Sequence, residues 1–474
     1  MATDEGKEGH DMADFATEHK EDHRHETQEL NTHSVALAAA LAEQKPNPWS
    51  RNMMKLYVIM GLGYLISTMN GYDSSLMGSI NAMIPYQETF GLDGAGSSTG
   101  MVFIIYNLGQ IAAFPFCGLL ADGYGRRWCI FAGCLVVVIG TAVQATANSL
   151  GHFIGGRFIL GFGASIASAA GPAYTVELAH PAYRGFMAGM YNVLWWLGNI
   201  IAGWATYGSN LHFTSSWAWR VPTIVQAGMP GVAMLVILFF PESPRWLISQ
   251  DRTEEALQVM AKYHGDGDVN HPVVQLQYRE IVEQHNMYRT ENPWWDYREL
   301  VNTRAARYRL AMVIGMSFFG QWSGNNVVSF TANTDKHPNL AYGVIVAIYI
   351  FGIFFAWGFT PLQTLYAVEC LENRTRAKGS GLNFLFLNIA MVVNTWGISE
   401  GIRKLGWKLY VIYIVWIGIE MVIIYFWFVE TAGKTLEELS EVFEAPNPRK
   451  ESTKKHKVEV DASGRVVHTK DTQV

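Results

Sequence analysis

Ten separate apolar stretches, each about 20 residues long, constrain the fold of this 474-residue chain more than any other feature. A helix of that length matches the thickness of a bilayer core, and lipid offers no partner to a backbone group left unpaired. The sequence therefore predicts an all-α membrane protein. We expect spans near 56–77, 101–121, 128–147, 153–174, 186–207, 221–240, 310–330, 341–362, 382–398 and 409–428.

The composition supports a membrane location for most of the chain. Charged residues make up 16% of the sequence, against roughly a quarter in soluble proteins, and 50% of the residues are hydrophobic. The charges lie in the tails and loops, so the net charge of −6 says little about function. The four cysteines show no metal-ligand spacing and are expected to pack as core residues: Cys117, Cys129, Cys134 and Cys370.

Basic residues indicate the orientation of the predicted spans. Loops that carry Arg126 and Arg127, Arg184, and 374–378 alternate with the loops 78–100 and 148–152, which have no Lys or Arg. Because basic loops stay in the cytoplasm, both termini and the connection between the sixth and seventh spans are expected inside the cell. We expect the first span to act as the uncleaved signal.

Two motifs at the ends of apolar stretches occur twice along the chain. Val176-Glu177 precedes Arg184, and Val368-Glu369 precedes Arg376 at the same spacing. In addition, Pro241-Glu242-Ser243-Pro244-Arg245 follows the sixth stretch, and Glu430-Thr431-Ala432-Gly433-Lys434 follows the last. Such repeats indicate a membrane protein of two related halves, and most proteins of that kind are transporters.

The chain divides into five predicted segments. A disordered cytosolic tail occupies 1–50, and a six-helix bundle occupies 51–240. A cytosolic linker with short amphipathic helices follows at 241–307, then a partial bundle at 308–430 and a cytosolic tail at 431–474.

Four motifs in order resemble those of the sugar porter family of the major facilitator superfamily. They are the run Gly118–Arg127, Gly156-Arg157 with Gly161-Phe162-Gly163, Pro241–Arg245, and Glu430-Thr431 with Lys434. Segments 191–202, 321–328 and 359–378 are most similar to fungal disaccharide permeases of the lactose or cellobiose type. The resemblance covers roughly residues 50–445 and implies a two-bundle architecture, with six spans in the N-terminal bundle and four recognisable spans in the C-terminal one.

The second half departs from the family pattern. Sugar porters have twelve spans and a second Asp-x-x-Gly-Arg-Arg loop, which is absent after Leu310. The chain instead passes from Phe330 through 331–339 into a span that resembles the family's tenth. We therefore expect the eighth and ninth spans to be missing, through an altered transcript or gene model or through natural loss.

Asp73 and Arg157 are the candidates for proton coupling. Asp73 lies within the first span, where an ionised carboxylate is costly and needs a partner, a proton or water. The resemblance implies that Asp73 takes up the transported proton and that Arg157, in the fourth span, is its partner. The alternative is a fixed buried ion pair that only sets the packing of the helices.

Charged residues at the predicted cytoplasmic helix ends are candidates for gating. Such charges can pair across the two bundles and break when the inner side opens. Alternatively, the basic ones serve only to fix the topology. The candidates are Asp122, Arg126, Arg127, Glu177, Arg184, Glu242, Arg245, Glu369, Arg376 and Glu430.

Amide and Trp side chains in the fifth and seventh spans are candidates for sugar binding. Asn and Gln both donate and accept hydrogen bonds, and Trp offers a flat face to a sugar ring. Isolated amides in helices more often join neighbouring helices, and Asn383 and Asn394 are expected to do so. The candidate sugar-binding residues are Asn192, Trp196, Asn199, Gln321, Asn325, Asn326 and Asn388; the resemblance aligns Asn326 with the family's sugar-binding Asn.

These observations predict secondary active transport of a sugar across the plasma membrane, by proton symport and alternating access. A disaccharide or glucoside is favoured over a hexose. The sequence has no phosphate-binding loop, nucleophile–base pair or metal cluster, so no enzymatic activity, cofactor or nucleic-acid partner is expected. The expected partners are the sugar, protons and membrane lipid, and the oligomeric state stays open. The alternatives are a non-transporting sugar sensor and an inactive truncated permease.

Overall fold

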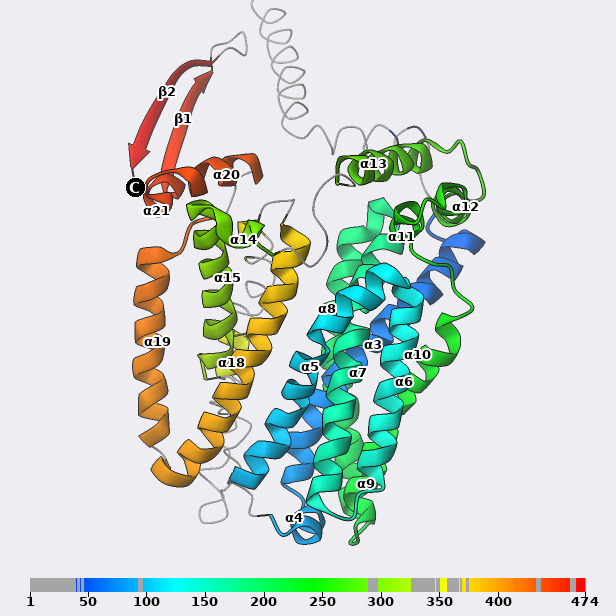
Figure 1. The fold of residues 1–474 in the computed structure, drawn as a ribbon, viewed down its shortest axis with the longest axis vertical. Helices are drawn as coiled ribbons and strands as arrows, with labels where there is room; N and C mark the ends of the chain where they lie inside the picture. The colour runs from blue at the N-terminus through cyan, green and yellow to red at the C-terminus, as the bar shows by residue number, and fades with distance from the viewer. Residues whose placement is uncertain are drawn as a thin grey trace, which may run out of the picture.

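Two groups of long helices form the membrane region of this protein in the computed structural model (Figure 1). The structure describes residues 40, 43, 47–92, 97–288, 297–324, 346, 350–355, 366, 369–371, 375–406, 408–431, 436–460 and 466–473. The predicted tail before 47 and the predicted span 341–362 thus lie largely outside the described residues.

The N-terminal bundle contains every one of the first six predicted spans. Polar side chains start two of its helices, because Ser50 and Ser149 accept hydrogen bonds from the backbone N–H groups of Met53 and His152. Its elements are α3 (Arg51–Asn81), α4 (Ile84–Phe90), α5 (Ser97–Gly123), α6 (Arg126–Ala145), α7 (Leu150–Leu178), η1 (Pro181–Tyr183), α8 (Arg184–His212), α9 (Trp217–Val225) and α10 (Gly228–Ile237).

The sixth span is broken in the middle, a feature that its apolar sequence did not predict. A turn at Gln226 and Ala227 separates α9 from α10. Pro230 explains the break, since it has no N–H to offer the carbonyl group of Gln226, four residues earlier, and its ring crowds that carbonyl. The break leaves Gln226 at the end of α9, inside the bundle.

The segment between the halves forms shorter helices, which lie at the same end of the molecule as the start of α3 (Figure 1). They are α11 (Pro244–Ser249), α12 (Thr253–His264), α13 (Pro272–Tyr288) and α14 (Glu299–Asn302). His264, at the end of α12, lies 3.0 Å through Nε2 from the carbonyl oxygen of Leu178 and 2.7 Å through Nδ1 from Oε1 of Gln277. These contacts attach α12 and α13 to the end of α7.

The C-terminal half contributes three long helices to the described region, α15 (Arg304–Trp322), α18 (Arg376–Leu405) and α19 (Lys408–Trp427). Helix α18 packs against α5, and the two halves meet there (Figure 1). After the last span, α20 (Leu436–Glu444) and α21 (Pro448–Ser452) precede an antiparallel hairpin of β1 (Lys454–Val460) and β2 (Val466–Gln473). Where the structure describes it, the membrane region is helical as predicted, whereas the hairpin in the tail was not foreseen.

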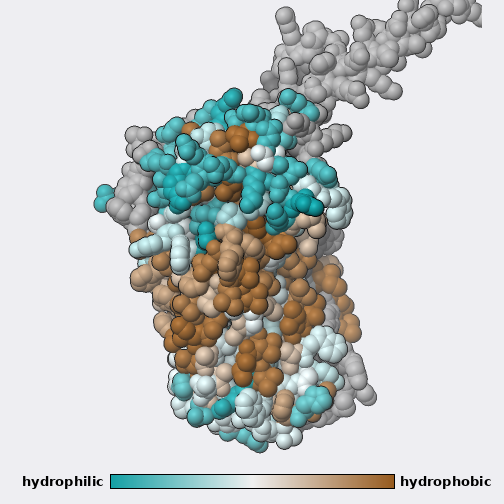
Figure 2. All heavy atoms as spheres, turned by 90° about the vertical axis from the view of Figure 1, so that its right-hand side faces the viewer, coloured by the Kyte–Doolittle hydropathy of each residue, from teal (hydrophilic) through white to brown (hydrophobic). Residues whose placement is uncertain are grey.

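The surface and the helix lengths agree with a membrane location. On the face that Figure 2 shows, apolar side chains gather across the middle of the molecule, and hydrophilic side chains gather at its upper end and, less densely, at its lower end. Among the described residues, six helical segments are long and apolar enough to cross a membrane, and they belong to α5, α6, α7, α9 with α10, α18 and α19. Helices α3, α8 and α15 fall short of that standard but lie beside them in the bundles (Figure 1).

The start of α3, the helices α11–α13 and the helices α20 and α21 lie at the same end of the molecule, and α4 lies at the opposite end (Figure 1). This arrangement is the one expected if both termini and the linker share one side of a membrane. All four cysteines are free and buried, in agreement with the prediction that they pack in the core.

Candidate functional site

Asp73 lies inside the N-terminal bundle, with 1% of its surface exposed. Its Oδ1 atom accepts a hydrogen bond from the side-chain amide of Gln226, which reaches it from the end of α9. Its Oδ2 atom has no hydrogen-bond partner among the described residues. A buried carboxylate with a single donor is poorly compensated for the water it has lost, so this site favours a proton or a mobile cationic partner.

Arg157, on α7, is 3% exposed and close enough to Asp73 for their charges to interact. No direct ion pair within 4 Å joins the two side chains, and the guanidinium carbon instead lies 5.1 Å from the centre of the Tyr106 ring on α5. Nε and Nη1 of Arg157 lack hydrogen-bond partners among the described residues. The structure thus brings the two predicted coupling residues near each other without closing the pair.

Small polar contacts join α3 to its neighbours on either side of Asp73. Ser67 donates to the carbonyl oxygen of Tyr191 at 2.5 Å, and Asn70 donates to Ser168 at 2.8 Å. Ser74, the residue directly after Asp73, lies through its hydroxyl oxygen 3.4 Å from Oδ1 of Asn199 on α8. Asn199 therefore contacts the chain directly after Asp73, and its role in sugar binding stays a prediction.

The other candidates on α8 are less enclosed. Trp196 is 55% exposed and meets Trp195 edge to face, with ring centres 5.1 Å apart. Asn192 belongs to the same helix, but its side chain lies outside the described residues. The exposed ring of Trp196 and the half-buried amide of Asn199, three residues later on α8, are the kinds of group that bind a sugar ring and its hydroxyl groups.

In the C-terminal half, the predicted sugar-binding residues are only partly described. Gln321 is half-buried on α15, and its carbonyl oxygen accepts a hydrogen bond of 2.6 Å from Asn394. Asn388 is buried and donates to the carbonyl oxygen of Phe384 on its own helix, so its amide N–H is engaged locally. Asn325 and Asn326 lie outside the described residues.

Two other amides of this half hold helices together, as the sequence predicted. Asn383 accepts a hydrogen bond of 2.6 Å from Ser317, which links α18 to α15. Asn394 accepts one from the hydroxyl group of Tyr413 on α19. The side chains of Asn383 and Asn394 thus have a structural role, because they join α18 to α15 and α19.

The charged cluster at the linker end of the N-terminal bundle is centred on Arg126. Its guanidinium group pairs with Glu177 at 3.2 Å and with Asp122 at 3.3 Å. Glu177 also accepts a hydrogen bond from the hydroxyl group of Ser243. These ion pairs all lie within the N-terminal half, so the expected pairing across the two bundles stays a prediction.

Glu242 caps the first turn of α6. Its carboxylate accepts hydrogen bonds from the backbone N–H groups of Arg126 at 3.1 Å, Arg127 at 3.2 Å and Ser243 at 2.9 Å. A carboxylate is favoured there because the N–H groups at a helix N-terminus carry partial positive charge. Burial raises the pKa of Glu242, and the N–H donors oppose that rise.

The remaining gating candidates are placed less closely. Arg184, at the start of α8, feels the charges of Arg245, Glu280 and Glu177, while the Arg245 side chain itself is exposed. Glu430 is exposed, and its backbone N–H donates to Ser452 at 3.2 Å. Glu369 is half-buried, and the side chain of Arg376 lies outside the described residues.

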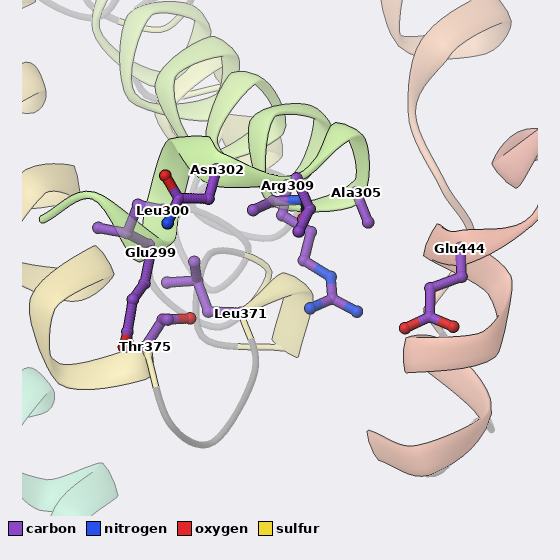
Figure 3. A pocket seen from close by; sticks show the side chains of 10 residues that line it. Glu299, Leu300, Asn302, Ala305, Arg309, Leu371, Thr375 and Glu444 are labelled. Carbon is purple, nitrogen blue, oxygen red and sulfur yellow. Dashed lines mark hydrogen bonds between the residues drawn. The ribbon is translucent and has the colours of Figure 1, made fainter. Parts of the chain in front are cut away.

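A cavity of about 660 Å³ opens at the linker end of the C-terminal half. In Figure 3 the side chains of Arg309 and Glu444 extend toward each other across it. It is lined by Glu299, Leu300, Asn302, Thr303, Ala305, Ala306, Arg309, Leu371, Thr375 and Glu444. No predicted sugar-binding residue lines this cavity, so it is separate from the candidate substrate site.

Sequence reasoning missed Gln226. A single Gln within an apolar stretch carries no signal of its own, and its partner Asp73 is far away along the chain. Pro230, which breaks the sixth span, was the available clue that a side chain near position 226 is presented to the bundle interior.

Residues 60–334 and 329–443 match the profile of the family described as "Sugar (and other) transporter". The two matched segments meet between α15 and α18, in the interval where two spans are predicted to be missing. Because the matches together cover most of the chain, they establish family membership.

Curated relatives extend over most of the chain. The MFS-type transporter criB of Aspergillus cristatus is 27% identical over 437 residues, which cover 82% of this chain and 92% of the relative. The MFS glucose transporter mfs1 of Aspergillus flavus is 25% identical over 488 residues, which cover 84% of this chain and 91% of the relative. That second alignment is longer than this chain, so the relative contains residues that have no counterpart here.

Solved structures of similar fold include the xylose transporter XylE from E. coli. Its inward-open structure superposes with a TM-score of 0.63 at 18% identity and covers 82% of this chain and 99% of XylE. A second structure, described as a proton:xylose symporter bound to 6-bromo-6-deoxy-D-glucose, gives a TM-score of 0.62 at 18% identity over 83% of this chain. At that identity the likeness establishes a shared fold.

Proposed function

This chain belongs to the sugar transporter family of the major facilitator superfamily, and from that premise we propose that it carries a sugar across the plasma membrane together with a proton. Transport would proceed by alternating access of a site between the two halves. We further propose that transport is coupled to protons, that the sugar is a disaccharide or glucoside, and that the protein resides in the plasma membrane.

Proton coupling rests on one observation, the buried carboxyl group of Asp73 within α3. The ionised form of an acid in that position is poorly solvated, so its protonation state depends on its surroundings. The carboxyl group can therefore bind and release a proton as the protein changes conformation. Arg157 is near enough to stabilise the ionised form after a small movement. The description of XylE as a proton:xylose symporter supports the same coupling here.

The substrate proposal rests on polar groups beside aromatic rings. Asn199 borders the Asp73 region, Trp196 offers an exposed ring, and Gln321 supplies an amide from the opposite half. Such a set suits a ligand with several hydroxyl groups and an apolar ring face. The relative mfs1 is a glucose transporter by name and XylE is a xylose transporter, so both monosaccharides belong in the test beside lactose and cellobiose.

Gating would use the Arg126 cluster. Its ion pairs fix the ends of α5, α6 and α7 relative to one another, and they would have to rearrange when the linker end opens. With the eighth and ninth spans missing, the C-terminal half would lack a matching cluster, so opening and closing would depend mainly on the N-terminal half.

Uptake of labelled lactose, cellobiose, glucose and xylose tests the proposal in cells that lack their own carriers, with surface expression verified. We expect saturable uptake of one disaccharide that a protonophore abolishes and that Asp73→Asn lacks. Uptake insensitive to the protonophore would contradict proton coupling. Saturable binding without uptake, in a protein at the cell surface, would indicate a sensor, and absence from the surface would indicate an inactive truncated permease.

A further inference from the structure

Gln226 occupies an unusual position for an amide in a membrane protein. It lies at the break between α9 and α10, and its side chain is 2% exposed. Its Nε2 atom donates a hydrogen bond to Oδ1 of Asp73, while its Oε1 atom has no partner among the described residues. Burying an amide costs free energy unless the amide is hydrogen-bonded. The hydrogen bond observed here goes to Asp73, the one acidic residue of α3.

The chemistry of this contact depends on the charge of Asp73. An amide N–H bonds more strongly to an ionised carboxylate than to a neutral acid. Gln226 therefore stabilises the ionised form and holds it on the α9 side of the bundle. Arg157 offers a competing partner from α7 but lies over Tyr106 in this structure.

Other groups that face Asp73 are occupied elsewhere. The hydroxyl group of Tyr72 donates to the carbonyl oxygen of Pro222 at 2.7 Å. Tyr106, on α5, interacts with Gln110 as well as with Arg157. From α8, the uncharged Asn199 contacts Ser74, the residue directly after Asp73. Among the described groups, only Gln226 donates a hydrogen bond to the Asp73 carboxyl group.

We propose that Gln226 is a positioning residue for Asp73. Its amide holds the ionised carboxylate of Asp73 against the end of α9, and away from Arg157, until a proton arrives. Protonation weakens the amide–carboxylate bond and frees α3 from the broken sixth span. The break at Pro230 makes this possible, because it lets the end of α9 move without bending a continuous helix. This inference rests on the proposed function, since it gives the proton site a second partner.

The test is an infrared titration of the purified full-length chain in lipid vesicles. The band of the protonated carboxyl group that Asp73→Asn removes identifies Asp73. In Gln226→Leu the midpoint of this band is expected to move upward by about one pH unit or more, because the ionised form has lost a charge-assisted hydrogen bond.

Thr223→Val is the matched control. Thr223 is fully buried one turn earlier on α9, and its hydroxyl group bonds only locally, to the carbonyl oxygen of Trp219 at 2.7 Å. This variant should leave the Asp73 midpoint unchanged. An unchanged midpoint in folded Gln226→Leu, or an equal shift in Thr223→Val, would overturn the proposal.

A second variant covers the case in which Gln226→Leu does not fold. Gln226→Glu keeps the shape of the side chain and places a second carboxyl group against Asp73, so the pair should titrate in two separated steps. A single unshifted step would contradict the proposed contact. The titration requires no transport, so the two proposals can fail separately. Absence of sugar uptake would contradict the proposed function alone, and an unchanged Asp73 midpoint would contradict this inference alone.

Discussion

Arg126 makes several contacts from one side chain, and together they join the start of α6 to the ends of α5 and α7. Its guanidinium group pairs with Glu177 on α7 and with Asp122 on α5, and it donates to the carbonyl oxygen of Ala121 at 3.0 Å. The side chains of Arg126 and Glu177 are 16% and 13% exposed, so the pair is largely shielded from water. Removal of one partner leaves the other charge poorly solvated.

Arg126→Gln is therefore expected to lower the stability of the folded protein by about 1–3 kcal/mol, seen as a lower midpoint of thermal unfolding in detergent. Arg252→Gln is the control, because the Arg252–Glu255 pair on α12 is exposed and such pairs contribute little. Equal effects of the two substitutions would contradict the structural role of the Arg126 cluster.

Individual residues differ in how far the sequence revealed them. Asp73 and Arg157 stand out because charge within an apolar stretch is rare and needs a reason. Gln226 does not stand out, because its role comes from a contact between distant segments and from a helix break that only the folded chain displays. The resemblance to sugar porters implied that Arg157 is the partner of Asp73, and in the structure Arg157 lies over Tyr106 without an ion pair to Asp73.

At the scale of the elements, glycines set how closely α3 and α8 approach. A Cβ atom at Gly71 would lie 1.8 Å from the carbonyl oxygen of Trp195, and one at Gly198 would lie 2.0 Å from that of Thr68. Small residues at such crossings let two helix backbones pack directly against each other. The same packing brings Asn199 to Ser74, the residue directly after Asp73.

Gly198→Ala should force α3 and α8 apart and destabilise the protein by about 1–3 kcal/mol, with a further loss of sugar uptake. Gly203→Ala, on the same helix, is the control, since a Cβ atom there meets nothing within 4 Å. Thermal unfolding of both variants in detergent is the measurement. A neutral Gly198→Ala would mean that the helices are not in direct contact.

The linker helices depend on two buried histidines. His180 accepts a hydrogen bond at Nδ1 from the backbone N–H of Ala182 at 3.2 Å, which requires this nitrogen to be unprotonated. Burial, followed by the charge of the neighbouring His264, lowers the pKa of His180 to about 3. Burial likewise lowers the pKa of His264, whose ring centre lies 5.3 Å from that of His180.

Docking of α12 and α13 should consequently weaken in acid. Histidine in the unfolded or undocked chain has a pKa of about 6.5, so below that pH the undocked form binds more protons than the docked one. The contribution is fully present above pH about 6.5 and is lost progressively as the pH falls toward the lowered values. Hydrogen exchange of 253–288 should be faster at pH 5.5 than at pH 7.5, after correction for the intrinsic rate; equal protection would contradict this account.

In the whole molecule, the two halves pack against each other through α5 and α18. The sequence predicted only part of this architecture. The two-half organisation and the helical membrane region followed from apolar length and repeated motifs. The break at Gln226 and the hairpin of β1 and β2 did not, because neither interrupts nor extends an apolar pattern. The expected loss of two spans concerns a stretch that lies outside the described residues, so it stays a prediction.

Insertion of the helix pair that the sequence predicts to be missing tests whether ten spans suffice for uptake. A chain that carries the eighth and ninth spans of a full-length relative, inserted after Phe330, should complete the wall of the C-terminal half. If the ten-span chain is deficient, we expect the restored chain to show at least about tenfold more uptake at equal surface expression, as a barrier change of about 1.4 kcal/mol gives. Equal uptake by both chains would show that ten spans suffice.

Transport by the purified chain in proteoliposomes is the most direct test of proton-coupled sugar transport. Labelled disaccharide is added outside, with the external buffer either more acidic than the lumen or at equal pH. The account predicts accumulation above the external concentration only with the acidic exterior, its loss on addition of a protonophore, and its absence in Asp73→Asn. Equal, non-accumulating entry under both conditions, or no entry by a correctly folded chain, would contradict proton-coupled sugar transport.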